Sequence, residues 1–81
     1  MAKTFSVDFT EDPSDLVARA EEAARRFGAD FQGDTTLGSF SGKGFAGTYQ
    51  IHAGVATVII TDKPFLVPWG VVESQVRGFF H

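Results

Sequence analysis

The spacing of apolar residues changes its period several times along this chain, and this limits the fold more than any other feature. Apolar side chains occupy every second position of residues 5–9, which predicts a strand with one buried face. Across residues 12–28 they recur at every third or fourth position, which predicts a helix. Residues 30–61 return to strand patterns, and residues 68–80 return to helical spacing.

This order of elements predicts an α+β fold, a two-layer sandwich with the order β-α-β-β-β-α. We expect a mostly antiparallel sheet with two helices packed on one face. Residues 1–81 are expected to form a single domain, because a chain of this length is too short for two.

Residues 12–28 carry signals for both ends of the first helix. Asp12 is a favoured N-cap residue, Pro13 suits the first helical position, and Gly28 can adopt the left-handed conformation that ends a helix. The residues that share one apolar stripe are Leu16, Val17, Ala20, Ala24 and Phe27. We therefore expect this helix to pack on the sheet through that stripe.

The central strands are rich in glycine. Leu37 and Phe40 cannot share a face of a regular strand, so we expect a bulge at Gly38. Residues 45–61 are expected to form a hairpin, with Gly54 as the left-handed residue of a three-residue loop. The glycines do not match the spacing of a phosphate-binding loop, and we interpret them as sites of close strand approach.

The composition argues against several kinds of binding site. The chain has no cysteine, which excludes disulfides and thiolate metal sites, and His52 and His81 are poorly spaced for a metal site. The formal net charge is −3, and the seven Lys and Arg residues are spread along the chain, which argues against a nucleic-acid partner. We expect no metal and no cofactor.

No segment has the length and composition of a signal peptide or of a membrane-spanning helix. Residues 1–10 lack the apolar core of a signal peptide. The uncharged run at residues 64–72 is far shorter than the roughly 20 residues of a transmembrane helix. We therefore expect a cytoplasmic protein without a transmembrane segment.

The polar residues that come closest to a catalytic pattern are Tyr49, His52 and Asp62. His52 could act as a general base with a carboxylate to orient it. However, the predicted hairpin holds His52 at its tip, in solvent, and no nucleophile stands beside it in the sequence. Ser39 and Ser41 lie in a strand without the sharp turn that exposes a nucleophilic serine. We expect no catalytic residues and a protein that is not an enzyme.

The uncharged stretch at residues 64–72 has three interpretations: a core segment, a partner interface, or a surface that dips into a hydrophobic phase. Two prolines disfavour a regular strand here, and three consecutive apolar residues cannot all point inward. Two adjacent phenylalanines near the C-terminus point in different directions from a helix, so both are covered only if something lies beside that helix. We favour a core segment combined with an interface, most simply in a homodimer. The expected interface residues are Phe65, Leu66, Val67, Trp69, Phe79 and Phe80.

An alternative is a domain that binds a small apolar ligand, or a minor enzyme, with a pocket between the sheet and the helices. Tyr49 or His52 would supply polarity in such a pocket. A cavity lined by Phe9, Phe45 and Val58 would favour this alternative.

Across most of its length the chain resembles the small bacterial proteins of the polyhydroxyalkanoic acid system. The shared pattern includes a helix that ends in Phe27 and Gly28, an acidic turn at Asp34, the segment GFAGTYQI at residues 44–51, and an E-x-x-V helix at residues 73–76. The resemblance implies a non-enzymatic accessory protein of polyester storage granules, in a regulatory role or at the granule surface. The partners it implies are the granule surface and granule-associated proteins, and it supplies no catalytic residues.

Overall fold

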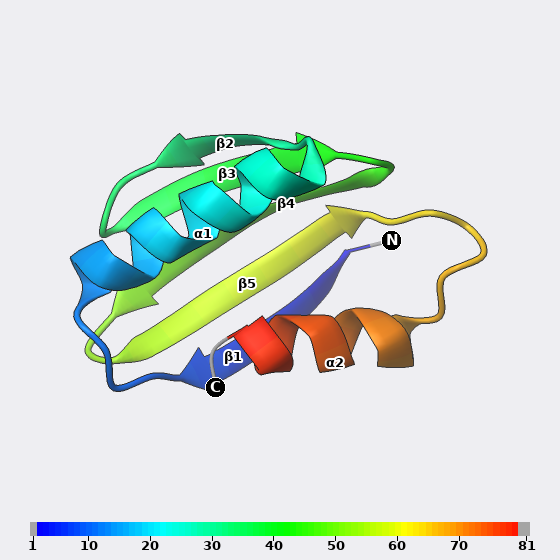
Figure 1. Cartoon of the computed structure of the whole chain (residues 1–81). Helices are drawn as coiled ribbons and strands as arrows, with labels where there is room; N and C mark the ends of the chain where they lie inside the picture. Colours follow the sequence, from blue (N-terminus) through cyan, green and yellow to red (C-terminus); the bar gives the residue numbers. More distant parts are fainter. Residues whose placement is uncertain (1, 80–81) are drawn as a thin grey trace.

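The computed structural model describes residues 2–79, which form a five-stranded antiparallel sheet with two helices on one of its faces (Figure 1). The strands and helices are β1 (Lys3–Asp8), α1 (Pro13–Phe27), β2 (Asp30–Gly33), β3 (Leu37–Gly42), β4 (Phe45–His52), β5 (Val55–Asp62) and α2 (Trp69–Phe79). Across the sheet the order is β1-β5-β4-β3-β2. The predicted α+β sandwich is confirmed.

The sequence predicts three strands between the helices, and the structure has four. β2 and β3 form a hairpin whose turn is held by Asp34. The side-chain Oδ1 of Asp34 accepts hydrogen bonds from the backbone N–H groups of Thr36 (2.8 Å) and Leu37 (3.1 Å). Aspartate favours turns for this reason, but the glycines on either side hide the strand that precedes the turn. The added strand widens the sheet without changing the fold class.

The predicted bulge at Gly38 is wrong. Gly38 pairs in regular register with both neighbouring strands. A bulge is not needed, because Leu37 is 55% exposed and does not have to share a face with Phe40. A register shift of the sheet lies instead between Ala46 and Gly47.

β4 and β5 form the predicted hairpin, but its loop has two residues rather than three. His52 pairs with Val55, which leaves Ala53 and Gly54 in the turn. Both have positive φ angles, 52° and 79°. Two positive φ angles give a turn whose twist matches that of the flanking strands. Gly54 is therefore left-handed as expected, in a shorter loop.

The first helix, α1, begins and ends as the sequence predicts. The Asp12 carboxylate accepts hydrogen bonds from the backbone N–H of Ser14 (2.8 Å) and from its hydroxyl (2.6 Å). Pro13 is the first helical residue, and Gly28 follows the last one with a φ angle of 83°. Asp12 and Gly28 thus satisfy backbone groups that a helix end would otherwise leave without partners.

The core lies between the sheet and the helices, in two clusters of buried residues. One cluster contains Phe5, Tyr49, Val58, Ile60 and Val72, and the other contains Phe9, Leu16 and Ala56. On the opposite face of the sheet, polar residues such as Thr4, Ser6, Thr48 and Gln50 are exposed. β5, which carries apolar residues on both faces, lies in the interior of the sheet between β1 and β4.

Two kinds of feature are absent from residues 2–79. Neither helix there is long and apolar enough to cross a bilayer. No group of three or more His, Asp or Glu side chains lies together there in a way that could hold a metal ion.

Candidate apolar ligand groove

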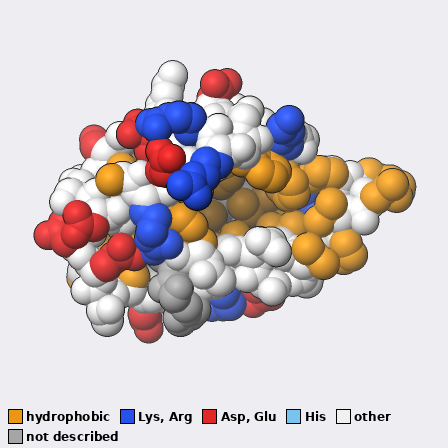
Figure 2. All heavy atoms as spheres, viewed as in Figure 1, with side chains coloured by type: hydrophobic (Ala, Val, Ile, Leu, Met, Phe, Trp, Pro, Cys, Tyr) orange, Lys and Arg blue, Asp and Glu red, His pale blue; other side chains and the backbone are white. Residues whose placement is uncertain are grey.

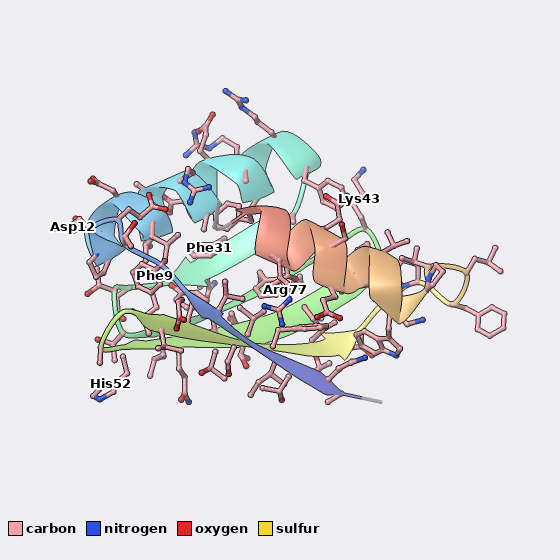
Figure 3. All side chains as sticks on the ribbon, turned by 90° about the horizontal axis from the view of Figure 1, so that it is seen from below. Phe9, Asp12, Phe31, Lys43, His52 and Arg77 are labelled. Atoms are coloured by element: carbon pink, nitrogen blue, oxygen red, sulfur yellow. The ribbon has the colours of Figure 1, made fainter. Side chains whose placement is uncertain are left out.

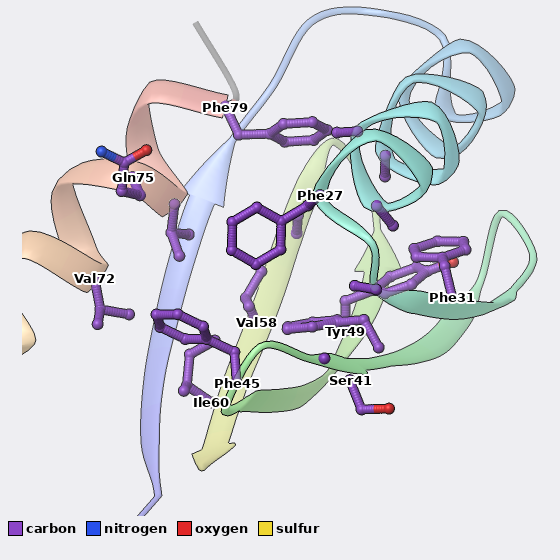
Figure 4. A pocket seen from close by; sticks show the side chains of 18 of the residues that line it. Phe27, Phe31, Ser41, Phe45, Tyr49, Val58, Ile60, Val72, Gln75 and Phe79 are labelled. Atoms are coloured by element: carbon purple, nitrogen blue, oxygen red, sulfur yellow. The ribbon is translucent and has the colours of Figure 1, made fainter. Parts of the chain in front are cut away.

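A groove with a volume of about 570 Å³ lies between α1 and α2, over the sheet face that the helices share. We call it the helix groove. Its floor consists of the sheet residues Phe31, Phe40, Phe45, Tyr49, Ile51, Ala56, Val58 and Ile60. Its walls consist of Leu16, Val17, Ala20, Ala23, Ala24 and Phe27 on one side, and of Val67, Val71, Val72, Val76 and Phe79 on the other. Figure 2 shows a hollow with hydrophobic side chains, and Figure 4 shows the groove from close by.

The groove exists because α1 presents small side chains to it. Ala20, Ala23 and Ala24 line the wall on the α1 side. An alanine methyl group reaches less far from the helix backbone than the side chain of Leu or Phe. The space that larger residues would fill between the helices therefore stays open.

Arg19 and Phe79 connect the two helices at one end of the groove. The Arg19 guanidinium lies over the Phe79 ring, with 4.3 Å between its Cζ atom and the ring centroid. Arg19 also donates a hydrogen bond to the backbone carbonyl of Phe79 and forms an ion pair with Glu11. A cation–π contact combined with one hydrogen bond holds the C-terminal end of α2 against α1.

Phe27 and Phe45 border the groove toward its other end, where α1 finishes. Their rings meet edge to face, with 6.4 Å between the ring centroids. Phe27 is 53% exposed although its side chain lines the groove (Figure 4). A ligand in the groove would shield this exposed aromatic surface from water, which favours binding.

Tyr49 carries a polar group in the floor of the groove. Its hydroxyl donates a hydrogen bond to the backbone carbonyl of Asp34 (2.8 Å), and its ring stacks on Phe31 with 5.6 Å between the centroids. Burial, followed by the charges of Asp34 and Glu21, raises the pKa of Tyr49 above its ordinary value. The hydroxyl therefore stays protonated and bound to the β2–β3 turn.

Two further polar residues, Ser41 and Gln75, border the groove. Both are exposed, and Figure 4 shows their polar ends pointing away from the space between the helices. A ligand in the groove would therefore meet hydrocarbon on nearly all sides. Such a surface selects apolar ligands, because a buried polar group without a partner is costly.

The structure places the predicted interface residues at separate sites. Phe65 and Leu66 are 91% and 87% exposed, on the loop between β5 and α2. Val67 and Phe79 are half-buried and line the helix groove. Trp69 is half-buried in the core.

These residues do not form one continuous surface. Trp69 packs against Phe5, with 6.4 Å between the ring centroids. Phe65 and Leu66 precede α2, whereas Phe79 is its last residue. The remaining interface residue of the prediction, Phe80, lies outside the described residues.

Tyr49, His52 and Asp62 are not brought together. Tyr49 lines the helix groove, whereas His52 is exposed at the β4–β5 turn (Figure 3). Asp62 ends β5, and at about 3.3 Å per residue it lies roughly 20 Å along the strand pair from that turn. His52 and Asp62 therefore cannot form the acid–base pair considered from the sequence.

The groove corresponds in part to the pocket of the alternative prediction. Phe45 and Val58 line it, whereas Phe9 is buried in the second core cluster instead. The sequence reasoning missed the part played by Ala23 and its alanine neighbours on α1. A run of alanines facing strands rich in aromatic residues is the signal that could have indicated an open space.

The fold and the groove define a small α+β domain with a candidate apolar binding site on its sheet. No family model, curated protein or solved structure matches this chain. The resemblance to the polyhydroxyalkanoic acid system proteins therefore stays a prediction.

Proposed function

We propose that this protein is a non-catalytic binding domain that holds an apolar chain, of the fatty acyl or hydroxyalkanoate kind, in the helix groove. The observation that carries the proposal is about 570 Å³ of space bordered by apolar side chains of the sheet and both helices. Small-molecule sites in proteins typically have volumes of roughly 300–1,000 Å³ and mostly apolar walls.

An unbranched chain suits the groove better than a compact polar ligand. The chain would lie on Val58 and Ile60, between the helices, with the Arg19–Phe79 contact at one end. Its carboxyl or ester end would remain in water at the rim near Phe27, because the lining offers it few hydrogen-bonding groups.

The sequence resemblance makes hydroxyalkanoates the first ligands to test. We propose an accessory role at polyester storage granules in the cytoplasm, where the protein would bind hydroxyalkanoate chains without reacting with them. An apolar groove supports this role, since the alkyl tail of a medium-chain hydroxyalkanoate is an unbranched hydrocarbon.

A homodimer is the second candidate. Phe27 and Val71 are 53% and 48% exposed at the border of the groove, and a second copy of the chain could cover them. Such a dimer would use the groove as its interface and would compete with a ligand.

The test is a matched pair of substitutions on α1, Ala24→Leu and Ala18→Leu. Ala24 lines the groove, whereas Ala18 is exposed on the same helix and does not line it. Leucine is a good helix former, so both variants should fold. Binding of dansyl undecanoate is measured by fluorescence, together with its displacement by a medium-chain hydroxyalkanoate.

We expect Ala24→Leu to weaken binding by at least roughly tenfold, the effect of one or two misplaced methylene groups in an apolar pocket. Ala18→Leu should bind as the unmodified protein does. Equal binding by all three proteins would contradict the proposal. Sedimentation tests the homodimer instead. A stable dimer that dissociates in the Ala24→Leu variant and does not take up the probe would assign the groove to self-association.

A further inference from the structure

An apolar tip projects from the loop between β5 and α2. Phe65 and Leu66 are the central residues of a turn in which the Val67 N–H donates a hydrogen bond to the Pro64 carbonyl (3.1 Å). Their side chains are the most exposed large hydrophobic groups of residues 2–79, at 91% and 87%. Figure 2 shows a hydrophobic protrusion at the end of the molecule where Figure 1 draws this loop. We call Phe65 and Leu66 the apolar tip.

The loop beneath the tip is anchored on the folded domain. Pro64 and Pro68 flank the turn and restrict its backbone. Pro64 packs on the β3–β4 turn, where a β-carbon on Gly44 would stand 3.0 Å from the Pro64 Cγ atom. Val67 is half-buried beside the core. The turn that exposes the tip therefore packs on the domain through Pro64 and Val67.

Two of the three lysines of the chain lie at the base of the tip. The Nζ atoms of Lys63 and Lys3 lie 5.3 Å and 5.7 Å from the ring centroid of Trp69, which begins α2. Lys43 belongs to the β3–β4 turn on which the loop packs, but its side chain reaches toward Gly28 at the end of α1. Two cations and an indole ring thus lie behind two exposed apolar side chains.

Acidic residues gather at the other end of the molecule. Asp8, Glu11 and Asp12 lie on the β1–α1 connection, at the sheet end opposite the tip. Figure 2 shows acidic side chains spread over that end, whereas the protrusion carries none on the visible face. Asp30 and Asp62 are the carboxylates at the strand ends near the tip. Lys3, Lys43 and Lys63 outnumber these two carboxylates at that end of the sheet, and Glu73 of α2 is paired with Arg77, so this end is cationic on a chain whose net charge is −3.

We propose that the apolar tip docks this protein on an anionic phospholipid surface. Phe65 and Leu66 would enter the acyl region, and the lysines would lie against the headgroup phosphates. Trp69 would lie at the boundary between them, where aromatic rings with a polar edge are favoured. This inference goes beyond the groove and does not depend on what the groove binds.

The test compares vesicles of phosphatidylcholine with vesicles that also contain phosphatidylglycerol. Binding is measured by co-flotation and by the fluorescence of Trp69, which is the only tryptophan of the chain. The tip variant is Phe65→Ser with Leu66→Ser. The control is Leu37→Ser, which removes a 55% exposed leucine from the opposite end of the sheet. Urea unfolding of each variant checks that it is folded.

We expect binding to anionic vesicles, with a blue shift of Trp69 emission and a strong decrease when salt is added. The partition coefficient of the tip variant should fall about tenfold for each apolar residue replaced, and that of Leu37→Ser should not change. Lys63→Gln should lose roughly fivefold on anionic vesicles and almost nothing on neutral ones.

Three results would overturn the proposal. They are the absence of vesicle binding by the unmodified protein, unchanged binding by the tip variant, and tip-dependent binding to neutral polyester particles but not to lipid. The last result would assign the tip to a polymer surface. Ala24→Leu should leave vesicle binding unchanged, which separates failure of the tip from failure of the groove.

Discussion

Tyr49 lies across Gly38, so that a β-carbon on that glycine would overlap the tyrosine ring. The Tyr49 hydroxyl also stands where a β-carbon on Gly33 would be, and from there it donates its hydrogen bond to the Asp34 carbonyl. Two paired glycines on β2 and β3 therefore leave room for one side chain of β4. That side chain forms part of the floor of the helix groove.

Replacing Gly38 with alanine should lower the free energy of unfolding by about 2 kcal/mol, because the new methyl group would force the Tyr49 ring to move. Gly70→Ala is the control. Gly70 lies in α2 with open space around it, so alanine there should raise the free energy of unfolding by up to about 1 kcal/mol. Urea unfolding monitored by circular dichroism measures both. Equal effects of the two substitutions would contradict the close packing of the Tyr49 ring on Gly38.

Ala53 should be replaceable with a gain in stability. Its φ angle of 52° is costly for a residue with a β-carbon other than Asn or Asp. Because Asn-Gly is a preferred pair for a two-residue hairpin turn, Ala53→Asn should raise the free energy of unfolding by about 1 kcal/mol. A lower melting temperature for this variant would contradict the turn geometry.

Acid should weaken the fold through Asp12 and Asp34. The hydroxyl and then the backbone N–H of Ser14 lower the pKa of Asp12. The backbone N–H groups of Thr36 and Leu37 lower the pKa of Asp34. Both folded pKa values lie below the unfolded ones, so their stabilisation is complete above about pH 4 and is lost as the pH falls through the folded values.

The check is urea unfolding at neutral and at acid pH. A double variant, Asp12→Asn with Asp34→Asn, keeps an oxygen acceptor at both sites but removes the titration. It should lose less stability on acidification than the unmodified protein does. Equal losses in the two proteins would mean that other carboxylates cause the acid sensitivity.

The elements that local chemistry determines could be predicted from the sequence. Asp12, Pro13 and Gly28 mark the limits of α1 because capping depends on residues close in the chain. The alternation of residues 45–61 likewise indicates the β4–β5 hairpin. The sequence indicates a turn at Asp34, but it does not show a separate strand before that turn, because glycines interrupt the apolar pattern on both sides.

The groove could be predicted only as an alternative, because its size depends on how far apart the two helices pack. Val72 and Leu16 show the right apolar spacing in the sequence, yet spacing does not tell whether the helices on which they lie touch each other or stand apart. Likewise the sequence shows that one or two of residues 65–67 must face outward. The Pro64–Val67 turn in the structure shows that the outward-facing residues are Phe65 and Leu66.

The central claim is that an apolar chain lies on the sheet between the helices, and methyl NMR tests it most directly. Val58 and Ile60 face the helix groove, whereas Ile59, between them on β5, points to the opposite face and is an internal control. With a medium-chain hydroxyalkanoate bound, we predict nuclear Overhauser contacts from its alkyl protons to Val58, Ile60 and Val72, and none to Ile59. Contacts confined to Leu66, or shared equally by Ile59 and Ile60, would contradict the account.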